Sequence, residues 1–582
     1  MFIFRNFFFA LILFASQQSA AFSPFSGPNE LCTSVRVLFD YDLSFTSTEK
    51  HLLCGQSHNE AWETIPLNQA RRMMQRFLEA RGYHRPNFRI DGDILYVEPG
   101  PLSLVRELKT SFEHPDFQLA SYWQPIGRPL TPETLDSIEK WVSAKLSYIG
   151  FPCSSVSTRG DPEAGVVEVL IEAGTPWTFD RISEDPIPFV RGGMLERYRA
   201  FQKGQTYDAR LLELSSQRLI DSQIVVNSRF TPNCKSEPSG TIRHEILAGA
   251  PRLVSFGLGF DTENLFIMHG SWRNSRLTET ASLLDLSTTL TYRQQNILAL
   301  FDWYYLPIPS RHYLKTSFKM ERLYERRFET RTIRSVFAPA WRYDTDHLRT
   351  EIFLGPSIQQ ETSIRGEGPK TARIVSLDLG LSLEDHLFEY YSNSPKTGYR
   401  VRLDASRTTK EAFSDIAARR LALEFTWLWN VLKLDPEIWI LGTRGHIASS
   451  APAEETSAED LPASFRFYLG GSQDMRGFSR QSLPLESQGA LSQAYWGHEL
   501  RLNNVLPYGF QPLLFADWGW LGERSWRLDP TQFFSPGLGA RWESPVGAMR
   551  GSFAHGFVSG PDRKRYEHLG NWQFYFSFGE QF

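Results

Sequence analysis

The chain has 582 residues, a formal net charge of −4 and 22% charged residues. A chain of this length is expected to form at least two folded regions, and its charge balance provides no basic field for nucleic acid. Aromatic residues make up 14% of the chain, yet the mean hydropathy is only −0.33, and no apolar run after the first residues is long enough for a membrane helix. This combination is typical of a transmembrane β-barrel, in which lipid-facing residues alternate with polar lumenal ones.

The first residues have the pattern of a secretory signal. Arg5 precedes an apolar stretch over residues 7–15, and the small residues Ser19-Ala20-Ala21 follow. The pattern predicts a signal peptide over residues 1–21, cleaved before Phe22. The alternative is an N-terminal membrane anchor, for which the apolar stretch is too short.

Four cysteines would meet an oxidising compartment after export and are candidates for disulfides: Cys32, Cys54, Cys153 and Cys234. Four cysteines allow three connectivities. A bond between Cys32 and Cys54 is favoured because a local loop closes easily. The cysteine spacings match no zinc pattern, so no metal and no cofactor are expected.

Between about residues 30 and 251, a β-α-β-β unit recurs three times. In the second unit, Leu135, Ile138, Val142 and Leu146 recur at helical spacing, and Pro132 suits the first helical position. The expected helices span residues 66–80, 132–149 and 207–222. The expected strands span residues 87–90 and 94–97, then 104–112, 151–158 and 165–172, then 224–230 and 240–246.

The steps from helix to glycine to aromatic residue, Arg81-Gly82-Tyr83 and Ile149-Gly150-Phe151, resemble those of the polypeptide-transport-associated (POTRA) domain, as do the closing Gly-x-Pro segments. The resemblance implies three POTRA-like domains, over residues 22–101, 102–176 and 177–251. The alternative is a set of unrelated small α+β domains. In either case, an exposed sheet edge can accept an extended segment by strand addition.

From residue 252 onward, short alternating strands replace the helical pattern, and no further helix is expected. In the terminal strand Trp572, Phe574, Phe576 and Phe578 share one face. About 330 residues, at roughly 20 per strand with its loop, give about 16 strands, an even number suited to a bacterial barrel. A sheet in lipid must close, and a soluble sheet this aromatic would aggregate. Residues 252–582 are therefore predicted to form an all-β transmembrane barrel of about 16 antiparallel strands.

Residues 465–478 combine a short aromatic strand with a glycine-flanked turn that presents Arg476. If Leu500 and Leu514 face lipid, alternation places Glu499 and Asp517 on the lumenal face of their strands. Arg476 is therefore expected to form a charge-assisted pair with these carboxylates inside the barrel. The alternative is a solvated Arg476, with Glu499 bound to Arg501 on its own strand.

Several segments resemble the outer-membrane assembly-factor superfamily, the surface-antigen barrels of the BamA and TamA kind. They are Leu469-Gly470-Gly471, Met475-Arg476-Gly477-Phe478, Glu499-Leu500-Arg501, Phe515-Ala516-Asp517-Trp518-Gly519, residues 537–547 and the terminal strand ending at Phe582. The resemblance implies that the sixth external loop folds into the lumen, where its arginine meets acidic residues of the wall. Met475 stands where Val or Ile is usual, which keeps that position apolar.

The barrel must close where the first strand, about residues 254–260, meets the last, about residues 572–579. Gly257 and Gly259 weaken the first strand, which suggests a lateral seam that opens for incoming client strands. A disulfide formed by Gly257→Cys with Tyr575→Cys is expected to lock it and abolish function. The residues assigned to this seam are Gly257, Gly259, Phe574, Phe576, Phe578 and Phe582.

The resemblance is closest to the TamA-like branch and implies an insertase in the bacterial outer membrane, with its N-terminal domains in the periplasm. Its implied partners are unfolded outer-membrane clients, including autotransporters, outer-membrane lipid and an inner-membrane-anchored, TamB-like scaffold. The alternatives are a principal BamA-like assembly factor, which would have five repeats, and a two-partner secretion translocator, which would have two and a plug helix. No helix is expected over residues 22–31.

No catalysis is expected. His498-Glu499 begins like a zinc-protease motif, but Leu502 stands where the second histidine should be. The chain also lacks a Gly-x-Ser-x-Gly elbow and a phosphate-binding P-loop.

Overall fold

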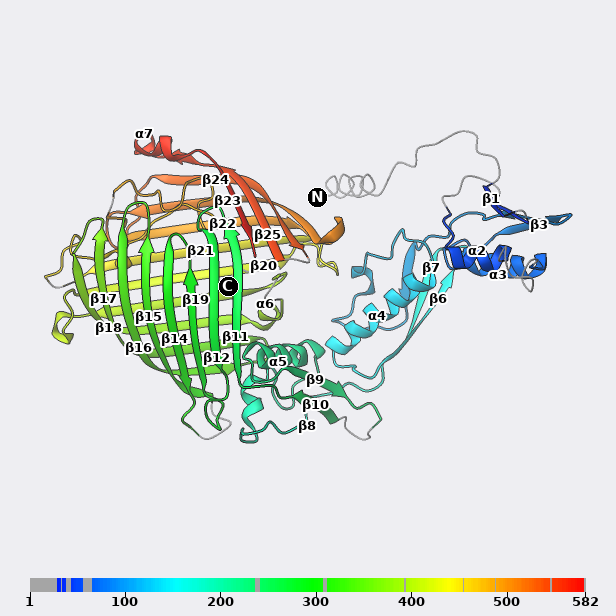
Figure 1. The fold of residues 1–582 in the computed structure, drawn as a ribbon, viewed down its shortest axis with the longest axis horizontal. Helices are drawn as coiled ribbons and strands as arrows, with labels where there is room; N and C mark the ends of the chain where they lie inside the picture. The colour runs from blue at the N-terminus through cyan, green and yellow to red at the C-terminus, as the bar shows by residue number, and fades with distance from the viewer. Residues whose placement is uncertain are drawn as a thin grey trace. The chain divides into compact units, whose positions relative to one another are not determined.

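A computed structural model describes residues 29–32, 34–37, 43–55, 65–235, 241–306, 311–391, 394–453, 455–486, 488–544 and 547–579 (Figure 1). The chain forms two compact units. The first contains the described residues up to 115, with residues 124–143 and 156–172; the second contains residues 116–123, 144–155 and those from 173 onward. The predicted signal peptide and most of the stretch 22–31 lie outside the described residues.

The first small sheet has the strand order β1-β2-β4-β3. Its elements are β1 (Asn29–Cys32), β2 (Val35–Val37), α2 (Ser47–Cys54), α3 (Leu67–Glu79), β3 (Asn87–Asp91) and β4 (Ile94–Glu98). Met74 and Leu78 of α3 pack in one core with Leu95 and Val97 of β4. Helix α2 was not predicted, since its eight residues are too few for a clear apolar period.

The second sheet has the order β5-β7-β6 and is accompanied by α4. Its elements are β5 (Glu107–Thr110), α4 (Pro132–Tyr148), β6 (Ser155–Asp161) and β7 (Val166–Glu172). The strand expected over residues 151–158 begins only at Ser155, because the chain first makes a turn in which the amide of Phe151 donates to the carbonyl of Leu146 at 2.9 Å. The strand expected over residues 104–112 is also shorter, since β5 spans Glu107–Thr110.

The third sheet has the order β8-β10-β9 and is accompanied by α5. Its elements are β8 (Arg181–Glu184), α5 (Ala209–Asp221), β9 (Asn227–Pro232) and β10 (Thr241–Leu247). Three small α+β sheets thus precede the barrel, as the repeats predict.

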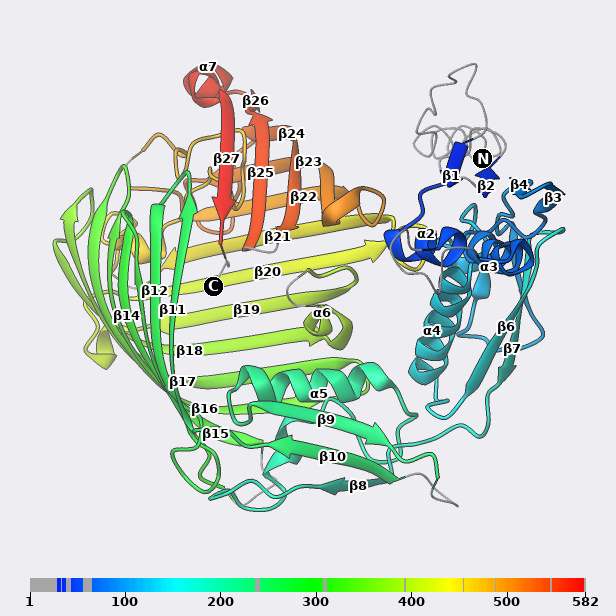
Figure 2. The same cartoon turned by 45° about the vertical axis from the view of Figure 1, so that its right-hand side comes forward.

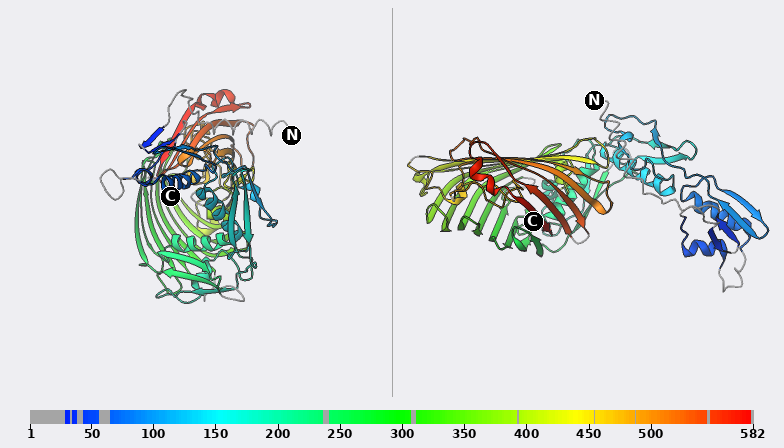
Figure 3. Two further views of the ribbon diagram at one scale, coloured as in Figure 1. Left: turned by 90° about the vertical axis from the view of Figure 1, so that its right-hand side faces the viewer. Right: turned by 90° about the horizontal axis from the view of Figure 1, so that it is seen from above.

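The rest of the chain is a closed antiparallel barrel, in which the strands run in sequence order around one wall (Figure 3). Segments β25 and β26 both pair with β24 and are one strand interrupted at Gly556, so the 17 segments form 16 strands. The predicted fold class is confirmed. The segments are β11 (Arg252–Asp261), β12 (Leu265–Asn274), β13 (Leu283–Leu290), β14 (Gln294–Trp303), β15 (His312–Tyr324), β16 (Glu329–Asp344), β17 (Leu348–Arg365), β18 (Thr371–Asp385), β19 (Gly398–Thr408), β20 (Ala418–Asn430), β21 (Trp439–Pro452), β22 (Ser492–Leu502), β23 (Phe510–Gly522), β24 (Gln532–Ser544), β25 (Gly547–His555), β26 (Phe557–Ser559) and β27 (Trp572–Phe578).

Two short helices interrupt the barrel region, where no helix was expected. They are α6 (His386–Tyr390) and α7 (Arg563–Tyr566), each too short for a helical period to show in the sequence. Short 3-10 turns occur at Leu119–Ser121, Met194–Tyr198, Lys410–Ala412, Ala463–Phe465, Pro507–Gly509 and Glu567–Leu569. None of the helices in the described segments is long and apolar enough to cross a membrane.

Large apolar side chains cover the outer wall of the barrel. On β11, Val254, Phe256 and Leu258 alternate along the strand and are all exposed. Exposed aromatic residues also lie at or close to the ends of several strands: Trp303, Tyr305, Tyr343, Tyr399, Trp427, Trp429 and Tyr508. An apolar band flanked by an aromatic girdle is the outer surface of a barrel that spans a lipid bilayer.

Helix α5 of the third sheet contacts α6, which connects β18 to β19 (Figure 2). Arg218 of α5 donates to the two oxygens of Glu389 at 2.9 and 2.6 Å, and it lies 2.9 Å from Asp344 at the end of β16. Arg349 of β17 also binds Glu389. Arg218 is almost fully buried, so this contact between the third sheet and the barrel is made by desolvated charges that depend on one another.

The contact should depend on pH. Burial alone would raise the pKa of Glu389, but Arg349 and Arg218 outweigh it and lower the pKa to about 2. Because this folded-state pKa is below the unfolded value of about 4.3, the stabilisation is present above that pH and is lost as the pH falls toward 2.

We expect Glu389→Gln to lower the unfolding temperature at pH 7, since breaking a buried ion pair costs roughly 3–5 kcal/mol. The gap from the wild type should narrow as the pH falls below about 4, because the Glu389 carboxylate of the unfolded wild type then takes up a proton while the folded one, with a pKa of about 2, stays ionised. Thermal unfolding in detergent between about pH 7 and pH 3 measures this. Glu411→Gln, at an exposed turn, is the matched control. A gap that stays constant with pH would contradict the assignment.

Candidate functional site in the barrel lumen

The segment between β21 and β22 folds inward and lies inside the barrel. Its two arms are joined by bridges between Phe467 and Ala490 and between Leu469 and Leu483. Gly470 and Gly471 have φ values of 114° and 124°, which side chains rarely allow, so the turn requires glycine at both positions. The side chains of Leu469, Met475 and Phe478 are fully buried. We call residues 463–491 the inner loop.

Arg476, near the tip of the inner loop, meets the barrel wall. Its Nε and Nη2 donate to the two carboxylate oxygens of Asp517 on β23, at 2.8 and 2.9 Å. Its Nη1 donates to Glu499 on β22 at 3.1 Å, and its backbone amide donates to Asp517 at 3.3 Å. The structure thus brings together the three charged residues that the sequence analysis grouped.

The pair is also packed and hydrogen-bonded from the side. The guanidinium carbon of Arg476 lies 3.3 Å from the ring centroid of Phe515, and the hydroxyl of Tyr495 donates to Asp517 at 2.9 Å. Asp517 is fully buried and Arg476 is 5% exposed. A buried bidentate pair with its remaining acceptors occupied fixes both position and orientation.

Glu499 is shared among several cations. Besides Arg476, it accepts from Arg501 on its own strand at 2.6 Å and lies 3.3 Å from Arg541 on β24. The pairing with Arg501, raised as an alternative to the lumenal pair, therefore coexists with it.

The tip of the inner loop rests against the last strands. A Cβ added to Gly477 would lie 2.4 Å from the backbone nitrogen of Gly556, at the interruption between β25 and β26. The Tyr575 hydroxyl on β27 donates to the carbonyl of Phe478 at 2.7 Å. The loop therefore supports β25 to β27 from inside, and only a glycine at position 477 permits this approach.

The opposite side of the inner loop is held by the early strands. The amide of Ser472 donates to Glu263, in the turn after β11, at 3.3 Å, and the Ser472 hydroxyl also contacts that carboxylate. Arg480 donates to Glu325, in the turn after β15, at 3.0 and 2.9 Å. The inner loop is thus fastened to the turns after β11 and β15 as well as to the wall strands β22, β23 and β27.

The seam between the first and last strands is short. In the described part of the chain, β11 and β27 share two residue pairs, Phe260 with Phe578 and Asp261 with Ser577. By contrast, β11 pairs with β12 along all of its 10 residues, and β27 pairs with β25 along all of its 7.

The assigned seam residues are distributed unevenly. Gly259 lies at the contact, where an added Cβ would be 3.2 Å from the carbonyl oxygen of Phe578, whereas Gly257 has no β27 partner among the described residues. Phe574 is exposed on the outer face and Phe576 is half-buried. Phe582 lies outside the described residues. The expected lock between positions 257 and 575 does not fit the register of the seam: Phe260 is opposite Phe578 and Asp261 opposite Ser577, so position 575 lies beyond the end of β11 and not opposite Gly257.

All four cysteines are bonded. Cys32 is joined to Cys54, and Cys153, which follows α4, is joined to Cys234 in the loop after β9. The second bond links consecutive repeats. Within the described ranges, no group of three or more His, Cys, Asp or Glu side chains is placed to hold a metal ion.

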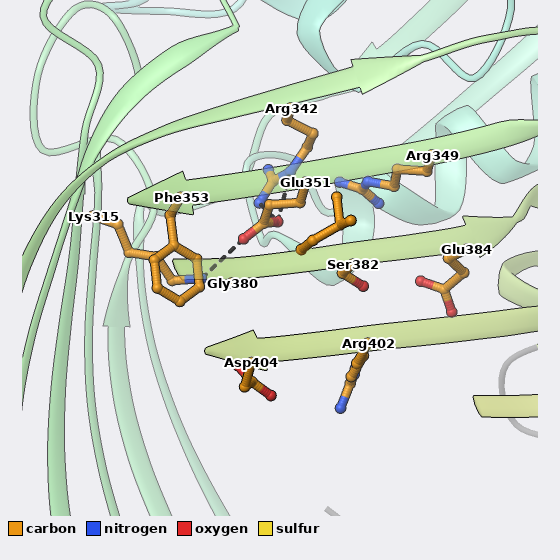
Figure 4. A pocket seen from close by; sticks show the side chains of 11 residues that line it. Lys315, Arg342, Arg349, Glu351, Phe353, Gly380, Ser382, Glu384, Arg402 and Asp404 are labelled. Atoms are coloured by element: carbon orange, nitrogen blue, oxygen red, sulfur yellow. Dashed lines mark hydrogen bonds and ion pairs between the residues drawn. The ribbon is translucent and has the colours of Figure 1, made fainter. Parts of the chain in front are cut away.

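A second charged region lines the lumen on β15 to β19, around a cavity of about 390 Å³ (Figure 4). Lys315 and Arg342 share Glu351 there, at 2.9 and 2.8 Å. Arg402 and Asp404 line its other side. A hydrated lumenal wall of mixed charge is what a barrel interior requires.

Sequence reasoning missed Tyr495 and Phe515, although Phe515 lies two residues from Asp517 and Tyr495 lies four residues from Glu499. Period-2 alternation from Glu499 and Asp517 places them on the same inner face, so the signal was available. No sequence pattern predicts the contact of Glu263 with the inner loop, because that contact depends on where a turn meets a loop far away in the sequence.

Arg476→Ala should destabilise the barrel, because it leaves Asp517 buried without its cation, at a cost of roughly 3–5 kcal/mol. Arg476→Lys keeps the charge but loses the bidentate fork, so an intermediate loss is expected. The unfolding temperature in detergent measures both. Arg402→Gln, which removes a lumenal arginine away from the inner loop, serves as the control; an equal loss in that variant would contradict a specific role for the pair.

The family model of the Omp85 superfamily domain matches residues 357–582. No curated protein sequence matches the chain. Among solved structures, BamA of Haemophilus ducreyi lacking POTRA domains 1–3 is similar at 15% identity and a TM-score of 0.49, covering 82% of this chain and 99% of that one.

CdiB of Acinetobacter baumannii and CdiB of Escherichia coli are each similar at 14% identity, covering 82% of this chain and 90% of theirs, with TM-scores of 0.45 and 0.46. At these identities and scores, the structural likenesses carry no functional argument. The family match stands by itself: over residues 357–582, this chain carries an Omp85 superfamily domain.

Proposed function

We propose that this protein is an outer-membrane insertase of the TamA-like kind, which templates the folding and membrane insertion of client β-barrels or autotransporters. The Omp85 domain supports a role in protein insertion or translocation in general, and its barrel supports the bacterial outer membrane as the location. The observation that supports an insertase is the short seam between β11 and β27, which share two residue pairs.

The seam supports strand addition for a physical reason. Backbone donors and acceptors of β11 on its β27 side, over residues 252–259, have no strand partner among the described residues. Unpaired backbone groups at a strand edge form a template for another strand, and leaving them unpaired in lipid is costly. A client strand that pairs with β11 would relieve that cost, so no nucleotide is required.

The inner loop makes the two edges of the seam unequal. It braces β27 through the hydrogen bond between Tyr575 and Phe478, whereas near β11 its hydrogen bonds in the described part of the chain go to Glu263, in the turn that follows the strand. In the proposed mechanism β27 is the supported edge and β11 is the edge that accepts the client strand.

The three small sheets are proposed to be periplasmic POTRA-like domains, over residues 22–101, 102–176 and 177–251. Each sheet has outer strands, for example β3, β6 and β9, that can extend by strand addition. The proposed partners are unfolded clients and an inner-membrane-anchored, TamB-like scaffold.

The first test is insertion of an unfolded outer-membrane protein into liposomes with and without this protein. Wild type should accelerate insertion, and Arg476→Ala should reduce the acceleration strongly because the brace on β27 is lost. The matched control is Arg402→Gln. If Arg476→Ala accelerates insertion as well as the wild type does, the pairing of Arg476 with Asp517 has no role in insertion. Ion conductance without any acceleration would favour a translocator of the two-partner secretion type.

The second test locks the seam. Phe260 and Phe578 are directly opposed, so Phe260→Cys with Phe578→Cys should form a disulfide across β11 and β27. The oxidised form should lose insertion activity, and reduction should restore it. Because reduction also breaks the two native disulfides, reduced wild type is assayed in parallel. Full activity of the oxidised form would overturn the lateral mechanism.

A further inference from the structure

A run of apolar residues forms a loop of the third sheet, between β8 and the 3-10 turn that follows it. The run is Pro186, Ile187, Pro188, Phe189 and Val190, and we call it the apolar loop. Ile187 is buried, whereas both prolines are exposed and Phe189 is 93% exposed. Large apolar side chains normally lie inside a folded domain, so an exposed apolar run of this kind indicates a surface that another apolar phase covers.

The apolar loop is held in one conformation. Phe189 has a φ of 63°, in the left-handed region that bulky side chains rarely adopt. Pro186 and Pro188 fix their own φ angles, and Ile187 packs in one core with Met194 and Ala281. The loop therefore presents Phe189 from a stiff backbone. A stiff segment loses little conformational entropy when its tip enters an apolar phase.

The apolar loop is fixed to the rim of the barrel, at the turn between β12 and β13. The backbone amide of Arg191 donates to the carbonyl of Glu279 in that turn at 3.1 Å, and its Nε donates to the Glu279 carboxylate at 2.8 Å. Arg197, just after the loop, donates to the carbonyl of Thr280 at 2.8 Å. Ala281, which packs with Ile187, belongs to the same turn. These contacts hold the loop beside the rim.

This part of the rim carries aromatic residues that face lipid. Trp303, the last residue of β14, lies on the outer face with Ile297 because side chains alternate along the strand. Tyr305 is also exposed, and its ring centroid lies 6.0 Å from that of Trp303. The hydroxyl of Thr280 donates to the carbonyl of Tyr304, between them, at 2.8 Å. Aromatic residues at strand ends mark the headgroup level of the bilayer, so the turn that holds the apolar loop lies at that level.

We propose that the apolar loop inserts into the adjacent lipid leaflet, with Phe189 as its membrane anchor. The apolar groups of interfacial segments enter about 5–10 Å, to the boundary between headgroups and acyl chains. The attachment to a rim that itself faces lipid favours a phospholipid surface over a protein partner, and the same turn carries Leu277, which is also exposed. Insertion would attach the third sheet to the membrane as well as to the barrel. The proposal requires a barrel that spans a bilayer and does not depend on the insertase proposal.

The test labels the apolar loop in lipid vesicles. The four native cysteines are bonded in pairs, so Phe189→Cys supplies one reactive thiol for an environment-sensitive fluorophore. In vesicles of phosphatidylethanolamine and phosphatidylglycerol, the emission of this label should shift to shorter wavelength. Lipids brominated on the upper part of their acyl chains should quench it. Arg229→Cys, at an exposed position on β9 of the same sheet, is the matched control and should show neither effect.

A second pair of variants separates the role of Phe189 from the affinity of the label itself for lipid. A label on Pro188→Cys should be quenched, and adding Phe189→Ser should reduce this quenching several-fold. Because position 189 is exposed, Phe189→Ser should not lower the unfolding temperature in detergent.

Three results would overturn the proposal. A label at position 189 could be quenched no more than one at position 229, or Phe189→Ser could leave the quenching at position 188 unchanged. The label at position 189 could also stay in water until an unfolded outer-membrane protein is added, in which case the loop binds a protein and not the membrane.

Discussion

The pairing of Arg476 with Asp517 is the interaction on which the arrangement of the lumen depends. Both groups are removed from water, so each carries a desolvation cost that only its partner offsets. The bidentate geometry, the backbone amide, the Tyr495 hydroxyl and the Phe515 ring together fix one orientation of the loop tip. Such a pair contributes less to net stability than to uniqueness: it specifies where the inner loop ends, and therefore where Phe478 meets β27.

A membrane barrel normally satisfies every backbone group by closing fully, because lipid offers no replacement for a missing hydrogen bond. This barrel satisfies that rule around most of its wall, where neighbouring strands pair along most or all of their length. At β11 and β27 it does not, and Gly259 brings the two strands together only at one short contact. The weak place is thus confined to one seam, and the inner loop supports one of its edges.

Much of the barrel and its lumenal pair could be predicted from the alternation of side chains along the strands. Period 2 on β22 and β23 placed Glu499 and Asp517 inside, and a chain that must close in lipid leaves few options other than a barrel. The seam register could not be predicted, because it depends on the stagger accumulated over all strands, and a shift of a few residues moved the expected partner of Gly257.

Helices α2 and α6 were missed because short helices lack a readable period. The bond between Cys32 and Cys54 was favoured because its loop is short, and with four cysteines it leaves Cys153 and Cys234 as the remaining pair, which the structure joins.

The same device occurs at two separate places in the second unit. Arg218, from a helix of the third sheet, lies between Glu389 and Asp344, just as Arg476, from the inner loop, lies between Glu499 and Asp517. In each case a segment that is not part of the barrel presents a guanidinium to two carboxylates of the barrel region. Apolar contacts could hold these segments equally well, but they slide, whereas a buried arginine between two acids has one acceptable position. In the proposed mechanism, fixed attachments of this kind would hold the accessory segments in place while the short contact between β11 and β27 opens.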